Sequence, residues 1–438
     1  MTPTGLIFCI LFVAGCVLAL ARDPVYGAIT YIATFFLSPQ LRWWGQGPLQ
    51  PIRWSLIAAA ITLIAVFATR KRQQGLQPIR HPLIPFFFAF ILWLILQFGW
   101  CLDSDAQSDF ISYYVKFAIA ILLVHRVAYS EENIRRIMWT YVAGCFYFGL
   151  IAYTEYKGGR FEDFGGAGIN EANAGAVTLV TGMFVGSALF MEAKIRQKAV
   201  LLAMLPFIMN GLVTTISRSG FLAAAAGGIV FNIFTPMKFR RRVRILSALA
   251  VILFFALTGP SYWSRMQSLE YAGQNVKGVD TGAGRLDIIS AQWRMFKQYP
   301  WGCGATCTTV LSPQYLPRQD LAGGVRASHN TFMTMLVDHG IVGALFYVLL
   351  IVWMFRTLLR LARWYRHSEG FFAALYPGIA ASVTALVVGD MFVTYSKLEV
   401  RFWFVAILMA LSDIAIRAQS ARNDTALYPS GTAARLTT

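Results

Sequence analysis

The stretch AVLLAMLPFIMNGLVTTISRSGFLAAAAGGIVFNIFTP, residues 199–236, shows most directly what kind of fold this chain adopts. It consists of two apolar runs, which only the quartet SRSG at residues 217–220 separates. A helix that crosses a lipid bilayer needs about 20 mostly apolar residues, so each run is long enough for one span. The stretch therefore predicts two membrane helices joined by a very short connection.

Runs of this kind recur along the whole chain. The 438 residues are 57% hydrophobic and only 13% charged, whereas a soluble domain has about 25% charged residues. The composition predicts an all-α polytopic membrane protein with about 12 or 13 membrane helices. The first two runs are short and four residues apart, so one of them could instead be re-entrant. The runs lie at residues 5–20, 25–39, 54–69, 84–101, 110–129, 137–154, 175–191, 199–216, 219–236, 243–259, 331–355, 371–393 and 398–416.

The net charge of +17 could suggest a nucleic-acid partner, but the positions of the charges argue against one. Lysine and arginine gather in every second connector, and such connectors face the cytoplasm in bacterial membrane proteins. We therefore expect no nucleic-acid partner. We expect the chain to contact the surrounding membrane lipids. The basic connectors are residues 70–80, 126–136, 194–198, 238–244 and 356–366, and the tail after residue 416 is also basic.

One connector on the opposite side is far longer than the others. Residues 260–330 form a loop of roughly 70 residues, against about 4–6 in most loops, and such loops are usually functional. The sequence predicts four parts: an N-terminal helix bundle at 1–259, this loop as part of an active site, C-terminal membrane helices at 331–416 and a cytoplasmic tail at 417–438.

Arg218 is the first candidate functional residue. It lies beside Ser217 between two apolar runs, almost within hydrocarbon. A charge at such a position is costly and usually faces a protein interior or an aqueous cavity. The alternative is an interfacial arginine whose head extends back to the water.

Arg285 is the second candidate. It opens an amphipathic helix within the long loop, and this helix is expected to lie on the membrane surface or to pack on the bundle. A cation at a helix start is unfavourable, and an anion bound there by backbone N–H groups would offset it. An ion pair with Asp280 or Asp287 is the alternative. The apolar positions at helical spacing are Leu286, Ile289, Trp293 and Phe296.

His329 is the third candidate, because the loop re-enters the membrane through Ser328-His329-Asn330. A histidine at this boundary could accept a proton near neutral pH. Ser328 or Asn330 can cap the following helix, and a capping or packing role for His329 is the alternative. Further along, Asp338 and His339 could form a buried hydrogen-bonded pair.

Two arginines and one histidine, without metal-ligand spacing, suit a particular chemistry. Arginine binds phosphate oxygens through a planar fork, so a pair of arginines could stabilise a diphosphate leaving group. Histidine could take the proton of an attacking hydroxyl. No metal ion or other cofactor is expected.

At these residues the chain resembles the O-antigen ligase and polymerase superfamily, the Wzy-type membrane glycosyltransferases. An N-terminal run, residues 23–45, is similar to the front end of exosortase-associated O-glycosylation ligases in that superfamily. The other matching motifs are Asn170-Glu171-Ala172-Asn173, residues 215–220, Gly284-Arg285 followed by residues 299–304, and Ser328-His329-Asn330 through residue 343.

The resemblance implies an inverting, metal-independent GT-C transferase in the bacterial inner membrane, with its active site facing the periplasm. It would take a glycan from undecaprenyl diphosphate and pass it to lipid A core in lipopolysaccharide biosynthesis, or to another glycan or protein acceptor. Arg218 and Arg285 would bind the diphosphate, and His329 would activate the acceptor hydroxyl. Secondary substrate-binding candidates are Arg42, Arg160, Asn173, Ser217, Asn330 and Asp390.

Other functions stay open at this point. A repeat-unit polymerase and a protein O-oligosaccharyltransferase would use the same donor and the same membrane face. A polysaccharide-lipid transporter would place its ionisable residues nearer the bilayer midplane, and a structural scaffold leaves the arginines and the histidine unexplained. Cys303 and Cys307 lie in the outward loop at a spacing that permits a small disulfide.

Overall fold

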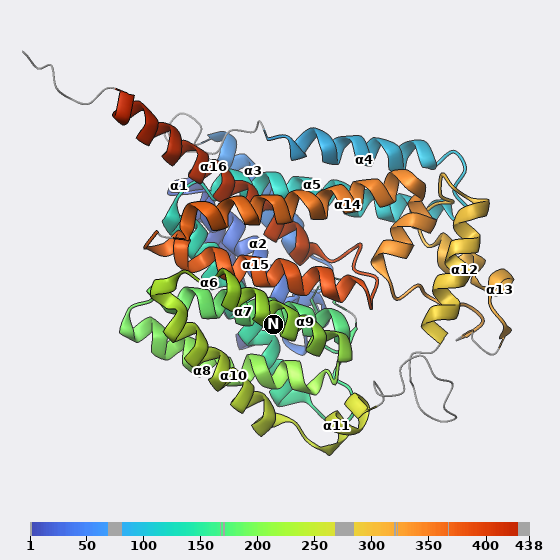
Figure 1. Cartoon of the computed structure of the whole chain (residues 1–438), viewed down its shortest axis with the longest axis horizontal. Helices are drawn as coiled ribbons and strands as arrows, with labels where there is room; N and C mark the ends of the chain where they lie inside the picture. The colour runs from blue at the N-terminus through green and yellow to red at the C-terminus, as the bar shows by residue number, and fades with distance from the viewer. Residues whose placement is uncertain are drawn as a thin grey trace, which may run out of the picture.

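The computed structural model describes residues 2–68, 81–166, 168–169, 171–267, 284–318, 321, 323–366 and 368–427, and this part of the chain is almost entirely helical (Figure 1). Each apolar run predicted to cross the membrane coincides with one helix, so the predicted fold class is confirmed. These helices are α1 (Pro3–Ala21), α2 (Val25–Leu37), α3 (Trp54–Ala68), α4 (Leu83–Gln97), α5 (Ser104–Val127), α6 (Glu131–Glu155), α7 (Ala172–Glu192), α8 (Ile195–Thr214), α9 (Arg218–Phe234), α10 (Arg240–Leu257), α14 (Thr331–Tyr365), α15 (Phe371–Asp390) and α16 (Glu399–Leu427).

The remaining elements are short. The long loop contributes α11 (Pro260–Gln267), α12 (Gly284–Gln298) and α13 (Cys307–Tyr315). Three 3-10 turns complete the described residues: η1 (Pro39–Leu41), η2 (Trp43–Gly45) and η3 (Met237–Phe239).

Within the described residues, seven helices are individually long and apolar enough to cross a membrane. Helices α9 and α10 are bent by 116° at the break between them. If the two are counted as one span, the number of candidate spans rises to eight. Side-chain contacts show that this pair is a hairpin: the rings of Phe221 and Phe254 are 5.8 Å apart, and the Asn232 amide donates to Ser247 at 3.2 Å. The total of about 12 or 13 spans stays a prediction, because helices such as α3 and α4 are shorter than a full span.

The connectors without basic clusters alternate with the basic ones along the chain. Their described parts lie at one end of the bundle, on the right of Figure 1, which we call the site end. The backbone N–H of Leu102 donates to the Cys303 carbonyl at 2.9 Å, and that of Phe161 donates to the Thr214 carbonyl at 3.0 Å. Two described helices of the long loop, α12 and α13, lie outermost at this end.

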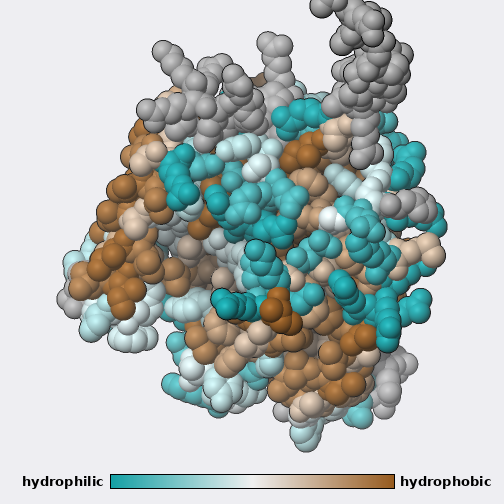
Figure 2. All heavy atoms as spheres, turned by 90° about the vertical axis from the view of Figure 1, so that its left-hand side faces the viewer, coloured by the Kyte–Doolittle hydropathy of each residue, from teal (hydrophilic) through white to brown (hydrophobic). Residues whose placement is uncertain are grey.

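The basic connectors at residues 126–136, 194–198, 238–244 and 356–366 meet at the opposite end, which we call the basic end. Lys238 pairs with Glu369 at 2.6 Å, and Arg242 donates to the Met191 carbonyl at 3.2 Å. Figure 2 shows this end face on, with hydrophilic residues gathered over much of it and hydrophobic residues along its margins. The alternation predicted from lysine and arginine is thus a real separation in space.

The core is centred on α15, whose span is 78% buried inside the protein. Small residues let its neighbours approach closely, as they do in membrane bundles generally. A Cβ atom on Gly378 of α15 would lie 2.6 Å from the Cβ of Ala188 in α7. This contact packs the halves of α7 and α15 that lie nearer the end of the bundle with the basic connectors.

Candidate active site

Arg218 is positioned by the sharp turn between α8 and α9. Ile216 adopts a left-handed backbone with φ of 46°, and Ser217 caps α9 by accepting a hydrogen bond from the Gly220 N–H at 3.0 Å. Gly220 allows close packing, since a Cβ there would lie 2.7 Å from the Cβ of Ala176 in α7. Arg218 is the first residue of α9 and is half-buried.

Asn173, in the first turn of α7, links this turn to the rest of the site end. Its side-chain oxygen accepts hydrogen bonds from the Ser217 hydroxyl at 2.7 Å and the Ser219 hydroxyl at 3.3 Å. Its backbone carbonyl accepts a hydrogen bond from the Tyr395 hydroxyl at 2.6 Å. Two of the secondary candidates, Asn173 and Ser217, are therefore in direct contact with each other.

The segment at residues 391–398, between α15 and α16, carries this network to the start of α14. The Tyr395 N–H donates to the Thr331 hydroxyl at 2.8 Å, and the Asn330 amide donates to the Met391 carbonyl at 3.3 Å. Thr331 is the first residue of α14 and is buried. Hydrogen bonds therefore run from the turn that carries Arg218 to the segment that carries His329.

His329 precedes α14 in a left-handed conformation, with φ of 50° and a half-buried side chain. Asn330 caps the helix by accepting a hydrogen bond from the Met333 N–H at 3.0 Å, so of the two caps that the sequence allowed, Ser328 and Asn330, the structure has Asn330. The buried Ser328 hydroxyl donates to the Asn330 carbonyl at 2.9 Å and accepts from the Gln292 amide at 2.7 Å. A non-glycine residue with this φ is held by its surroundings, and such residues cluster at functional sites.

Helix α12 packs on the bundle, which is one of the two arrangements expected from the sequence. The apolar stripe that identified it as amphipathic is largely exposed, with Leu286 64% and Trp293 49% exposed. The positions that do pack, against α13 and α14, are Ile288, Ala291 and Met295. Because α12 carries apolar residues on both faces, the 3.6-residue spacing alone did not identify the packed face.

Arg285 lies in the first turn of α12, and its side chain is outside the described part of the structure, as is Asp280. Gln292 follows seven residues later and contacts Ser328. On a regular helix this separation is about 10 Å along the axis. The helix that carries Arg285 is therefore attached beside His329, while the position of the guanidinium relative to Arg218 stays a prediction.

Asp338 and His339 do not form the buried pair that the sequence suggested. Asp338 accepts hydrogen bonds from the Thr306 N–H at 3.0 Å, the Thr308 N–H at 2.8 Å and the Thr308 hydroxyl at 2.7 Å. The ring of His339 instead lies 2.9 Å from the Gln97 side-chain oxygen. A kink at Gly340, with φ of 67°, separates this first part of α14 from the rest. Asp338 thus anchors the long loop.

Cys303 and Cys307 form a disulfide, which confirms the bridge that the spacing permitted. Their Cα atoms are 5.6 Å apart, within the usual range for a disulfide. The turn between them is also held by Gln107, whose side-chain oxygen accepts a hydrogen bond from the Ala305 N–H at 2.7 Å. Gln107 was not a candidate from the sequence, since nothing local to α5 points to the loop.

Asp390 is fully buried and forms an ion pair with Arg401 of α16, a residue that the sequence analysis missed. The Arg401 guanidinium donates to the carboxylate through both terminal nitrogens, one of them at 2.6 Å. Tyr347 donates to the same carboxylate and accepts from Arg401. The only sequence signal was an arginine inside an apolar run. Asp390 faces these partners and has no exposed surface.

Arg42 contacts the segment at residues 156–171, and Arg160 lies within that segment. Arg42 is only 5% exposed, donates to the Phe164 carbonyl and pairs with Glu155 at 3.6 Å. Arg160 is half-buried and lies 3.5 Å from Glu162. Arg42 therefore holds this segment against the bundle, and a direct role for either arginine in substrate binding stays a prediction.

A further cation, Lys397, lies in the segment at 391–398. Its ammonium is 5.6 Å from the ring centroid of Phe110 and 5.2 Å from that of Tyr113. Burial lowers the pKa of Lys397, and the carboxylates of Asp109 and Asp338 oppose that shift. The site end thus combines several cations with buried hydrogen-bonded polar groups. In the part of the chain that the structure describes, no three His, Cys, Asp or Glu side chains gather as metal ligands would.

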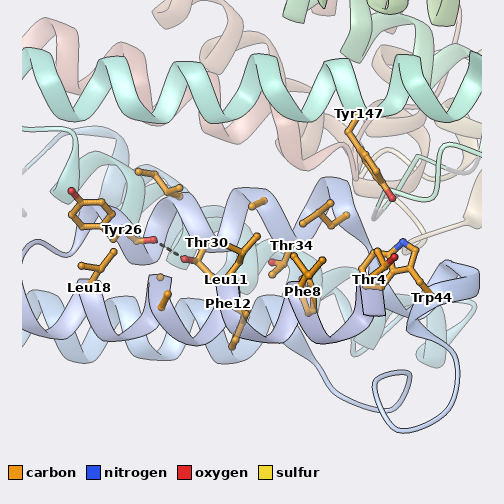
Figure 3. A pocket seen from close by; sticks show the side chains of 16 residues that line it. Thr4, Phe8, Leu11, Phe12, Leu18, Tyr26, Thr30, Thr34, Trp44 and Tyr147 are labelled. Carbon is orange, nitrogen blue, oxygen red and sulfur yellow. Dashed lines mark hydrogen bonds between the residues drawn. The ribbon is translucent and has the colours of Figure 1, made fainter. Parts of the chain in front are cut away.

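An apolar groove of about 430 Å³ runs between α1 and α2, as Figure 3 shows. Phe8, Leu11 and Leu18 line it along α1, and Trp44 and Tyr147 lie at its site end. The Arg42 guanidinium is 5.9 Å from the centroid of the Tyr147 ring, so the groove ends close to a buried cation.

A known protein family matches the region of the chain that contains the three principal candidate residues. Residues 199–348 match the family model Wzy_C, described as O-antigen ligase, and this range includes Arg218, Arg285 and His329. No curated protein matches the chain. The matched region carries the α8–α9 turn, the long loop and the start of α14, which build the site end. This chain is thus a polytopic membrane protein in which residues 199–348 are similar to the O-antigen ligase family.

Proposed function

We propose that the chain is a glycosyltransferase that moves a glycan from undecaprenyl diphosphate to an acceptor hydroxyl at the periplasmic face of the bacterial inner membrane. The observation that carries this proposal is the hydrogen-bonded path from Ser217 through Asn173, Tyr395 and Thr331 to the His329 segment. This path joins the turn that carries Arg218 to the segment that carries His329, at the end of the bundle opposite to the basic connectors.

The chemistry follows from the residue types. The acceptor hydroxyl attacks the anomeric carbon of the donor sugar, and His329 takes the hydroxyl proton. A new glycosidic bond forms as the bond from the anomeric carbon to the diphosphate oxygen breaks. The electron pair leaves with undecaprenyl diphosphate, whose added negative charge Arg218 and Arg285 stabilise. Inversion at the anomeric carbon follows from a single displacement.

The acceptor that we favour is lipid A core, which makes the enzyme an O-antigen ligase. The N-terminal resemblance to O-glycosylation ligases supports a ligase, and a protein acceptor or a growing repeat-unit polymer are the alternatives. The glycans of a deletion strain distinguish a ligase from a polymerase. Lipid-linked polymer accumulates if a ligase is lost, and single repeats on lipid A core remain if a polymerase is lost.

The sharpest test of the chemistry is His329→Asn. Asparagine tolerates the left-handed backbone at this position but does not accept a proton at neutral pH. We expect glycan transfer by the purified protein to fall by about 10²–10⁴-fold, the usual contribution of a general base. Arg218→Ala should also abolish transfer, because a charge-assisted contact to the leaving group is lost.

Arg244→Ala is the matched control, since Arg244 is an exposed cation at the basic end of α10. It should keep normal transfer, and all three variants should insert and express like the parent protein. Full activity in His329→Asn or Arg218→Ala would refute the assigned roles. A collapse of parent activity on addition of a chelator would contradict metal independence.

A further inference from the structure

A cavity of about 450 Å³ opens at the basic end, far from the proposed active site along the bundle. It lies where α9 breaks before α10, and the end of α14 and the start of α15 close it. Its polar wall contains Thr235, Arg240, Arg363, Arg366 and Tyr376. Three arginines from two helices therefore converge on one hollow.

These three arginines differ from other cations at the same end. Lys238 pairs with Glu369 at 2.6 Å, whereas within the described residues no carboxylate pairs with Arg240, Arg363 or Arg366. The Nε of Arg240 donates to the Thr235 carbonyl at 3.3 Å, which fixes the side chain at the cavity wall. The first turn of α10 contains no acidic residue to offset its positive end. The hollow thus concentrates uncompensated positive charge.

The opposite wall of the cavity is apolar and faces outward. Ile233 and Leu359 line it and are 65% and 52% exposed, as residues on the hydrocarbon-facing flank of a bundle are. Phe234 and Ala362 continue the same wall. A ligand that fits must therefore present a negative group to the arginines and an apolar chain to this flank.

We infer that the cavity binds the headgroup of an anionic phospholipid from the inner leaflet. A phosphate suits arginine donors, and the acyl chains would descend along Ile233 and Leu359. A free soluble phosphate would satisfy the arginines but leave the apolar wall unused. The bound lipid would hold the α9–α10 hairpin against α14 and α15. This inference does not depend on the proposed catalytic activity.

The test uses the full-length protein in detergent, with native mass spectrometry to measure binding of phosphatidylglycerol and of phosphatidylcholine. The pocket variant is Arg240→Gln/Arg363→Gln/Arg366→Gln. Each basic residue near a lipid headgroup contributes about 1 kcal/mol, so we expect roughly 100-fold weaker binding of phosphatidylglycerol to this site. Phosphatidylcholine binding should change little.

The matched control is Arg241→Gln/Arg356→Gln/Arg360→Gln, which removes the same charge from exposed positions of the same two helices. It should bind phosphatidylglycerol like the parent protein. A second variant, Ala362→Trp, fills the cavity without changing the charge and should also block binding.

Three results would overturn the inference. The pocket variant could keep parental affinity, or the control could lose as much affinity as the pocket variant, which would indicate general surface charge. Inorganic phosphate could also displace the lipid at low millimolar concentration, which would indicate a soluble phosphate ligand instead.

Discussion

At the scale of single residues, the ion pair of Asp390 with Arg401 is the most consequential contact that the sequence did not reveal. Both side chains are almost completely buried, and Tyr347 bonds to each of them. Desolvating two charges is costly, and only close pairing with further hydrogen bonds offsets that cost. The pair joins the end of α15 to the start of α16, next to the segment that anchors Thr331.

We predict that Arg401→Gln destabilises the protein by about 3–5 kcal/mol, because it leaves a buried carboxylate without its partner. Thermal unfolding of the purified protein in detergent measures the effect. The control is Glu131→Gln, which breaks the solvent-exposed pair with Arg135 and should cost less than about 1 kcal/mol. Equal stability losses in the two variants would contradict the role of the buried pair.

At the scale of elements, the long loop behaves as a covering layer that is tied down at several points. Asp338 holds the start of α13, Gln107 holds the disulfide turn, and Gln292 holds α12 to Ser328. Each of these contacts uses a buried polar group with a matched partner, which is how buried polar groups are accommodated. The loop therefore presents α12 and His329 to the bundle in a fixed arrangement.

Asp338→Asn tests this arrangement. One oxygen would be replaced by an NH₂ group that faces an N–H donor of Thr306 or Thr308, so we expect a loss of about 1–3 kcal/mol in stability. Limited proteolysis should cut the long loop faster than in the parent protein. Asp163→Asn, at an exposed carboxylate of the same end, should leave both properties unchanged. Parental proteolysis rates in Asp338→Asn would show that other contacts suffice.

At the scale of the whole molecule, the separation of connectors into a site end and a basic end is the feature that sets orientation. Lysine and arginine are retained on the cytoplasmic side of bacterial membranes, so we predict that the site end is periplasmic. The lipid-linked donor, its acceptor and the candidate residues would then share one face. The cavity at the basic end would lie in the inner leaflet.

Cysteine labelling in intact cells checks this orientation. In a background without free cysteines, Lys157→Cys at the site end and Lys194→Cys at the basic end are both exposed positions. A membrane-impermeant maleimide should label the first within minutes and the second only after the membrane is disrupted. Labelling of position 194 in intact cells would reverse the proposed topology and remove the periplasmic site.

The sequence by itself determined the helical segments and their alternation, and it indicated the region of the candidate site. Hydrophobicity along a segment and the positions of lysine and arginine are local properties, so residues 199–236 could be interpreted without any neighbour. The same holds for a cap at Ser328 or Asn330 and for the short spacing of Cys303 and Cys307. The candidate residues Arg218 and His329 were recognisable because polar chemistry at a membrane boundary is rare.

Only the tertiary structure decided which of these segments touch. The pairing of Asp390 with Arg401, the contact of Asn173 with Tyr395 and the packed face of α12 each depend on where other helices lie. Two apolar faces on one helix are equivalent in sequence until a neighbour covers one of them. A buried polar group likewise has no defined partner until the chain brings distant segments together, because its hydrogen bonds are satisfied in space and not along the sequence.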